Sequence, residues 1–314
     1  MVKILPKSKR PTEFYFFSGK GGVGKTSMAC ATALRFSKKS KVLLISTDPA
    51  HSISDSFETK IGGKIKGIKK NLFAVEIDPQ VSLEEYKEKL LPMLPNPDFF
   101  KSLGLDMMDM ASTPGVDEIA AFDKFLQFMN SRDYDIIIFD TAPMGHTLRL
   151  LSFPDVLESY IGKIIMLKAR FENITNLVKR FLPFGEEEKQ KINTKDAIEE
   201  IKKKIQEAKK LLASKQTNYN MVMIPEEMSI IESERAIKII KDYNIRLGSI
   251  IVNRIIPENP GCTFCSAKRK QQIERLKDIK KRFKDMDILQ VPLFKDEVKG
   301  FKMLERLGSE LYHS

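Results

Sequence analysis

The sequence predicts an α/β protein built on a doubly wound, mainly parallel sheet with an inserted α-helical subdomain. Three observations lead to this fold class. Short apolar runs rich in β-branched residues end in small or polar residues, as buried parallel strands do. Segments with helical periodicity separate many of these runs, which is the alternation of a βαβ fold. Two longer apolar segments with helical spacing interrupt that alternation.

The predicted strands are Glu13–Phe17, Lys41–Ser46, Leu72–Ile77, Asp135–Phe139, Tyr219–Ile224, Ser249–Val252 and Ile288–Val291. The predicted helices between them lie at about Thr26–Phe36, Ser229–Tyr243 and Ala267–Lys284. Near the end of the sequence, Phe301 to Leu311 carries a short apolar stripe, and we expect a final core helix there. Together these elements predict one parallel sheet with helices packed on it.

Two segments break the alternation and predict a second, helical subdomain. The first, residues 91–129, places aromatic, aliphatic and methionine side chains at three- and four-residue spacing. The second, residues 168–215, has the same amphipathic pattern. We therefore expect residues 1–90, 130–167 and 216–314 to form the main domain, which the chain leaves and re-enters twice.

Charge and targeting signals limit the classes of function. The chain has 53 Lys and Arg against 42 Asp and Glu, a formal net charge of +11. The basic residues fall in mixed-charge runs without a motif for RNA or DNA, so we expect solvated helix faces and no nucleic-acid partner. The N-terminus lacks the apolar core of a signal peptide, and no stretch reaches the ~18–20 apolar residues of a membrane span. These features predict a cytoplasmic protein.

A phosphate-binding loop follows the first predicted strand. Residues 18–26 read SGKGGVGKT, which fits the pattern G-x-x-x-x-G-K-[ST] between a strand and a helix. Backbone N–H groups of such a loop surround phosphate oxygens, Lys25 contacts the β- and γ-phosphates, and Thr26 is a Mg²⁺ ligand. The predicted nucleotide-binding residues of the loop are Gly19, Lys20, Gly21, Gly22, Val23, Gly24, Lys25, Thr26 and Ser27. The sequence therefore predicts an ATPase that uses Mg²⁺.

Lys20 is the unusual residue of this loop. Because Lys25 already holds the phosphates, the economical interpretation is that Lys20 points across an interface. In this feature the sequence resembles the deviant Walker A subclass of dimeric ATPases, which includes the nitrogenase iron protein, the Min division-site ATPases and the arsenical pump-driving ATPases. The resemblance implies a homodimer in which Lys20 contacts the nucleotide of the partner subunit and stabilises charge as the γ-phosphate leaves.

Two carboxylates follow predicted strands at the edge where open α/β sheets bind ligands. Asp48 comes after Lys41–Ser46, where it can orient or deprotonate the attacking water and can also cap the next helix. Asp140 directly follows Asp135–Phe139. It has the form of a Walker B carboxylate, which holds Mg²⁺ directly or through water.

Longer phrases narrow the resemblance to one branch of that subclass. STDPAHSISDSF, PGVDE and FDTAPMGHTLR look like the arsenical pump-driving and tail-anchored-protein-targeting ATPases, and the likeness runs over nearly the whole chain. It implies that Asp48 activates the water and that Asp140 belongs to switch II. It also implies that Glu226 lies near the nucleotide at the dimer interface, that Asn253 contacts adenine and that the loop of Pro292 packs on the base.

The three cysteines do not form a disulfide framework in a reducing cytosol. Cys262 and Cys265 have the spacing of zinc ligands, but Zn²⁺ takes four ligands and this pair supplies two. From the residues alone, incidental or redox cysteines stand beside a metal site as interpretations. The resemblance to the targeting branch implies that two such pairs meet at a homodimer axis and share one Zn²⁺. Cys30, on the helix after the phosphate loop, is expected in the core.

A single phosphate loop and a methionine-rich insertion favour the targeting branch over the arsenite-pump branch, whose members are usually two fused ATPase halves. The methionines of the first insertion are Met93, Met107, Met108, Met110 and Met129. Methionine adapts to many apolar sequences, and the resemblance implies a groove that holds the transmembrane segment of a tail-anchored client. An arsenite or antimonite efflux ATPase and a Min-type positioning ATPase remain as alternatives. The sequence does not identify a membrane receptor.

Overall fold

The structure is a computed structural model that describes residues 11–47, 52–77, 124–141, 203 and 206–312. Its strands are β1 Glu13–Gly19, β2 Val42–Ser46, β3 Lys66–Lys69, β4 Leu72–Glu76, β5 Ile136–Asp140, β6 Thr217–Met223, β7 Leu247–Ile255 and β8 Asp287–Pro292. They form one eight-stranded sheet in the order β3-β4-β2-β5-β1-β6-β7-β8. Within this sheet β3 and β4 are antiparallel, and the other neighbours are parallel. The predicted fold class is therefore confirmed.

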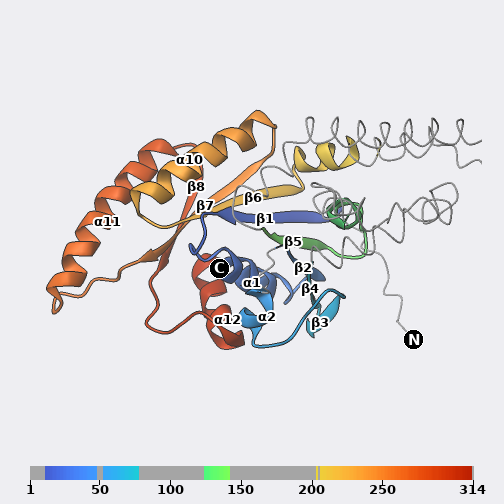
Figure 1. Ribbon diagram of the computed structural model, residues 1–314, viewed down its shortest axis with the longest axis horizontal. Helices are drawn as coiled ribbons and strands as arrows, with labels where there is room; N and C mark the ends of the chain where they lie inside the picture. Colours follow the sequence, from blue (N-terminus) through green and yellow to red (C-terminus); the bar gives the residue numbers. More distant parts are fainter. Residues whose placement is uncertain (1–10, 48–51, 78–123, 142–202, 204–205, 313–314) are drawn as a thin grey trace, which may run out of the picture.

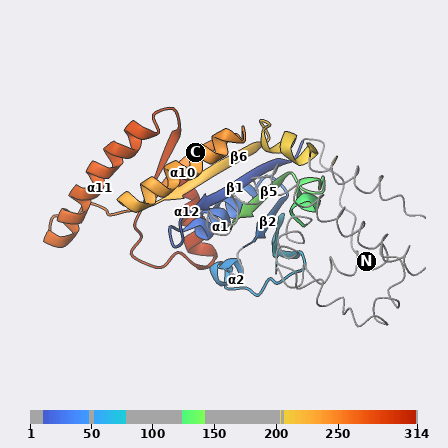
Figure 2. The ribbon, with the colours of Figure 1, turned by 45° about the horizontal axis from the view of Figure 1, so that its top comes forward.

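Helices cover both faces of the sheet (Figure 1). They are α1 Lys25–Phe36, α2 Ser52–Phe57, α10 Glu227–Asp242, α11 Thr263–Arg282 and α12 Gly300–Leu311. The helices α1, α2 and α12 lie on one face, and α10 and α11 lie on the other, as a second view also shows (Figure 2). The expected helices at Thr26–Phe36, Ser229–Tyr243 and Ala267–Lys284 correspond to α1, α10 and α11.

The central strands β1, β2, β5 and β6 are buried on both faces, which explains their largely apolar sequences. Successive residues of a strand point to opposite faces, so Leu44 packs with α1 while Leu43 packs with the α10 side. On the α10 side Phe16 stacks on Phe139 with ring centroids 4.8 Å apart and on Tyr219 at 5.7 Å. This double-sided core fixes the carboxyl ends of β1, β2 and β5 relative to one another.

The expected final core helix is α12, which buries its apolar stripe against α1. Leu304, Leu307 and Leu311 are at most 4% exposed. The hydroxyl groups of Thr32 and Tyr312 lie 3.0 Å apart and add a polar contact between the two helices. The helix α12 therefore belongs to the core of the main domain.

Most of the two predicted insertions lies outside the described residues, so the subdomain boundaries stay a prediction. Residues 124–129 and 206–212 are helical and lie at the ends of these segments. Their buried side chains, which join the core on the α10 side, are Phe125, Leu126, Met129, Ala208 and Leu212. Met129 is 0% exposed and packs in this core, so this one of the five insertion methionines is a core residue.

The strand β3 is the one described strand that the sequence pattern did not predict. Its sequence KGIK has one apolar side chain, and the strand lies at the edge of the sheet with mostly exposed residues. An apolar pattern cannot identify such a strand because no face of it is buried. The hairpin to β4 forms through a tight turn in which Asn71 adopts a left-handed conformation with φ 61°.

Candidate nucleotide site at the carboxyl ends of the strands

The phosphate loop connects the end of β1 to the start of α1, as the sequence predicts. Two glycines are required by close packing. A Cβ atom on Gly19 would lie 2.1 Å from the carbonyl oxygen of Val222, and one on Gly24 would lie 2.5 Å from Nδ2 of Asn253. Gly24 also adopts a left-handed conformation with φ 99°. No side chain among the described residues caps α1, so its N-terminal amides suit an anion.

Lys25 and Thr26 begin α1 and face the loop. Lys25 is 6% exposed, and its Nζ donates a hydrogen bond to the carbonyl oxygen of Lys20 at 3.2 Å. The hydroxyl of Thr26 donates to the hydroxyl of Ser52, on α2, at 3.2 Å. A buried ammonium at a helix N-terminus is suited to phosphate oxygens, and the Thr26 hydroxyl has the chemistry of a Mg²⁺ ligand.

Asp140 ends β5 and is 0% exposed. It lies in register with Phe17 of β1 and Ser46 of β2, so it occupies the ligand-binding edge of the central strands. The backbone N–H of Thr47 donates to the carbonyl oxygen of Asp140 at 3.1 Å, which brings the chain after β2 to the same place. Asp48 itself lies outside the described residues, so its water-activating role stays a prediction.

A cavity of about 1220 Å³ lies beside the loop. It is lined by the predicted nucleotide-binding residues Gly24, Ser27, Asn253 and Pro292. Glu226, the N-cap residue of α10, is exposed and does not line this cavity. The structure therefore brings four of the predicted residues together and leaves Glu226 at a separate position, at the carboxyl end of β6.

Asn253 braces the phosphate loop from β7. Its Nδ2 donates to the carbonyl oxygen of Val23 at 2.8 Å, and its Oδ1 accepts from the N–H of Arg254 at 2.8 Å. The side chain is 9% exposed. The family resemblance implies a contact of Asn253 with adenine, which stays a prediction, and the structure adds this contact with the loop backbone.

Glu76 is a site residue that sequence reasoning missed. It ends β4, is 2% exposed and accepts hydrogen bonds from the N–H of Ser54 at 2.7 Å and from the hydroxyl of Ser54 at 2.8 Å. These charge-assisted bonds fix α2, whose Ser52 contacts Thr26. A carboxylate at the end of a buried apolar strand was the available signal, because such a group needs partners.

Lys20 lies against its own subunit. Its Nζ is 2.7 Å from Oε1 of Glu232 on α10, and the two side chains are 39% and 31% exposed. The predicted contact with a partner subunit requires a second chain and stays a prediction.

Cys262 and Cys265 lie together at the start of α11. The Sγ of Cys262, the N-cap residue, accepts a hydrogen bond from the N–H of Cys265 at 3.3 Å. This bond lowers the pKa of Cys262, while the hydrogen bond with Cys262 raises the pKa of Cys265. A helix N-terminus favours a thiolate, which is the metal-binding form of cysteine. Among the described residues no group of three or more His, Cys, Asp or Glu side chains has the arrangement of a metal site.

Cys30 is fully buried on α1, as expected. Burial raises the pKa of its thiol, and the neighbouring Asp140 carboxylate adds to this effect. Cys30 is therefore a neutral core residue.

A comparison with protein families identifies the chain. The model of a family described as anion-transporting ATPase matches residues 12–313. The chain belongs to this ATPase family. It is 38% identical over 306 residues to "ATPase get3" of Schizosaccharomyces pombe, covering 95% of this chain and 91% of the relative. It is 36% identical over 300 residues to "ATPase ASNA1 homolog 2" of Paramecium tetraurelia, covering 94% and 91%.

A third relative is "ATPase GET3B" of Arabidopsis thaliana, 35% identical over 326 residues, which cover 96% of this chain and 79% of the relative. These matches confirm the predicted family and the predicted ATP-hydrolysing enzyme. The phosphate loop of such an ATPase binds ATP together with Mg²⁺. No described helix is both long enough and apolar enough to cross a membrane.

Proposed function

We propose that the protein is a cytoplasmic, homodimeric ATPase that binds the transmembrane segments of tail-anchored proteins and delivers them to a membrane. The observation that carries this proposal is likeness over nearly full length to relatives with one ATPase unit. The chain covers 91% of the S. pombe relative, so that relative cannot be a fusion of two such units. This organisation favours the targeting branch over pump subunits with two fused halves.

The proposed hydrolysis uses residues from four elements. The loop amides and Lys25 bind the phosphates, while Thr26 and Asp140 hold Mg²⁺, which shields the phosphate charge. Asp48 orients the attacking water. Lys20 of each subunit contacts the γ-phosphate in the partner subunit, so hydrolysis depends on how the two subunits lie.

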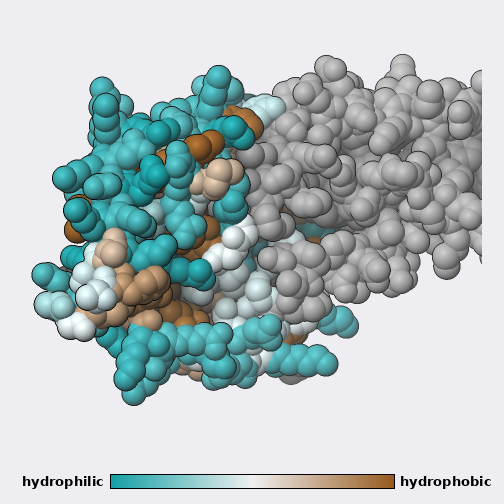
Figure 3. Space-filling model, turned by 60° about the vertical axis from the view of Figure 1, so that its left-hand side comes forward, coloured by the Kyte–Doolittle hydropathy of each residue, from teal (hydrophilic) through white to brown (hydrophobic). Residues whose placement is uncertain are grey.

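The proposed dimer shares one Zn²⁺ between Cys262 and Cys265 of both subunits. The pair supplies two thiolates close together, and two copies supply the four ligands of a tetrahedral site. The side chain between them, Phe264, is 69% exposed, which suits a contact with protein. The face drawn in Figure 3 is mostly hydrophilic, with apolar side chains in several separate patches.

Metal analysis of the purified dimer tests the zinc site. We expect one Zn²⁺ for two subunits, and loss of both Zn²⁺ and the dimer in Cys262→Ser. Cys30→Ser is the matched control, since Cys30 is buried in the core. A zinc-free dimer that is stable would contradict the proposed bridge.

The client-binding groove is proposed for the inserted subdomain, residues 91–129 and 168–215. Co-expression with a tail-anchored transmembrane segment should give a complex that stays in solution without detergent. A segment with two central leucines replaced by lysine is the control, because a charged segment does not fit an apolar groove. Failure to recover the complex with an intact, ATP-binding dimer would contradict client binding.

Two described residues make the alternatives less suitable. A metalloid site separate from the Cys262–Cys265 pair would need Cys30, the third cysteine, and Cys30 is 0% exposed. A positioning ATPase of the Min type needs an amphipathic helix free to lie on a membrane, but α12 packs its apolar stripe, including Leu307, against α1. Stimulation of turnover by arsenite would favour the efflux alternative.

A further inference from the structure

Glu232 joins α10 to the phosphate loop through Lys20, a residue 212 positions away in the chain. The ammonium of Lys20 donates to Oε1 of Glu232 at 2.7 Å, a charge-assisted hydrogen bond. The two side chains are 39% and 31% exposed, so the pair is neither fully solvated nor buried. The contact therefore gives Lys20 one defined position within its own subunit.

The backbone of Lys20 is tied to the phosphate site at the same time. Its carbonyl oxygen accepts from Nζ of Lys25, the residue that contacts the phosphates, at 3.2 Å. Lys20 thus contacts Lys25 through its backbone and α10 through its side chain. To reach a nucleotide in the partner subunit, the ammonium has to leave Glu232, because a compact charge cannot occupy both positions.

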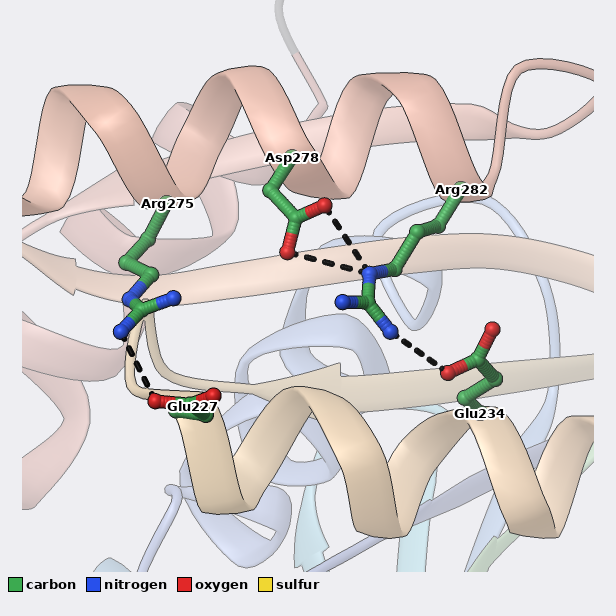
Figure 4. A network of polar contacts seen from close by, with 5 residues as sticks. All are labelled: Glu227, Glu234, Arg275, Asp278 and Arg282. Carbon is green, nitrogen blue, oxygen red and sulfur yellow. Dashed lines mark hydrogen bonds and ion pairs between the residues drawn. The ribbon is translucent and has the colours of Figure 1, made fainter.

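Two other acidic residues of α10 pair with α11 instead. Glu227 and Glu234, seven residues apart on one face of α10, bind Arg275 and Arg282 of α11 at 2.9 and 2.8 Å (Figure 4). Glu232 instead contacts Lys20 of the phosphate loop. Its contact with the loop is therefore separate from the packing of α10 on α11, and Glu234 provides a matched control on the same helix.

We propose that Glu232 is a positioning residue that holds Lys20 within its own subunit until the two subunits close on ATP. This proposal rests on the proposed contact of Lys20 with the partner's nucleotide. Closure exchanges a carboxylate for a phosphate as the partner of the ammonium, so Glu232 competes with closure. Removal of the Glu232 charge releases Lys20 and favours the closed dimer.

The test measures binding of a non-hydrolysable ATP analogue to purified full-length dimers. Closure breaks one such pair for each nucleotide bound, and a partly exposed ion pair shifts an equilibrium by roughly fivefold or less, so Glu232→Gln should lower the half-saturating concentration by up to roughly fivefold. Glu234→Gln should bind the analogue as the wild type does. The effect of Glu232→Gln should shrink as salt is added, since salt weakens the pair in the wild type.

The Lys20→Ala background separates this role from a general structural one. There Glu232→Gln should change nothing further, because the partner of Glu232 is already absent. An unchanged or raised half-saturating concentration in Glu232→Gln would overturn the proposal. The proposal would also fail if Glu232→Gln lowered this concentration by the same factor in the Lys20→Ala background. Glu232→Asp, which keeps the charge but shortens its reach, should give a smaller shift and replaces the Gln variant if that variant does not fold.

Failure of this proposal can be distinguished from failure of the proposed function. If Lys20→Ala turns over ATP at the wild-type rate, Lys20 does not contact the partner's nucleotide. Glu232 then has no closed state with which to compete. If Lys20→Ala loses turnover but Glu232→Gln has the half-saturating concentration of the wild type, the contact of Lys20 with the partner's nucleotide stands and only the role proposed for Glu232 is wrong.

Discussion

The phosphate loop and the cysteine pair of α11 are built in opposite ways. The loop is enclosed by its own subunit: Lys25 is 6% exposed, Asp140 is 0% exposed and Asn253 braces the loop backbone. The cysteines lie at an open helix N-terminus beside Phe264, which is 69% exposed. In the proposed dimer, the enclosed loop belongs to a single subunit and the open cysteine pair belongs to the interface. The proposed role of Lys20 joins the two, because Lys20 belongs to the loop of one subunit and contacts the nucleotide of the other.

Among the variants that test this comparison of the loop with the cysteine pair, Lys25→Ala should have the largest effect on ATP turnover. Loss of a preorganised cation at the transferred phosphate should lower ATP turnover by about 10²–10³-fold. If the two regions are independent, zinc content and dimer formation should stay as in the wild type. Steady-state kinetics and metal analysis of the same preparation check both expectations, and a loss of zinc would show that the regions are coupled.

Asn253→Ala tests whether the loop is held within one subunit. The variant leaves the Val23 carbonyl without its side-chain donor and removes a nearly buried amide, at a cost of about 1–2 kcal/mol in the free energy of unfolding. The half-saturating ATP concentration should rise as well, since the loop loses its brace. Urea unfolding and an ATP titration measure the two effects. Asn218→Ala, on neighbouring β6 and away from the loop, is the control.

The smallest effect concerns the two thiols. In zinc-free protein Cys262 should be alkylated several times faster than Cys265 near neutral pH, because hydrogen bonds from the backbone lower its pKa and hydrogen bonding to Cys262 raises that of Cys265. Below the pKa of both thiols the rates fall together, and well above it the difference disappears. Peptide mapping by mass spectrometry after brief iodoacetamide treatment measures the ratio. Equal rates at every pH would show that α11 does not distinguish its thiols.

Local sequence was sufficient to predict an element or a loop where a buried apolar run or a single motif determines it. The buried apolar run of β5 predicts both the strand and Asp140 at its end, and SGKGGVGKT predicts the loop. The contacts that sequence reasoning missed join residues far apart in the chain. Asn253 to Val23 spans 230 residues and Lys20 to Glu232 spans 212. Neither side chain lies in a local pattern that indicates its partner, because the strand order of the sheet brings them together.

The exposed edge strand β3 and the contact of Glu76 with α2 also could not be predicted from local sequence. Ile68 is the one apolar residue of β3, so the sequence of this strand does not alternate between apolar and polar residues. Glu76 could be recognised as a carboxylate at the end of a strand, but its bond to Ser54 follows from the position of α2. Such contacts depend on packing and not on local sequence.

Mixed dimers test the central claim most directly, that Lys20 acts in the partner subunit. One subunit carries Lys20→Ala, the other carries Lys25→Ala, and two affinity tags isolate the mixed dimer after co-expression. One of its two sites then combines an intact Lys25 with Lys20 from the partner, so turnover should recover to about half of the wild-type rate while each parent dimer stays inactive. A mixed dimer as inactive as its parents would contradict the claim, because Lys20 would then serve only its own subunit.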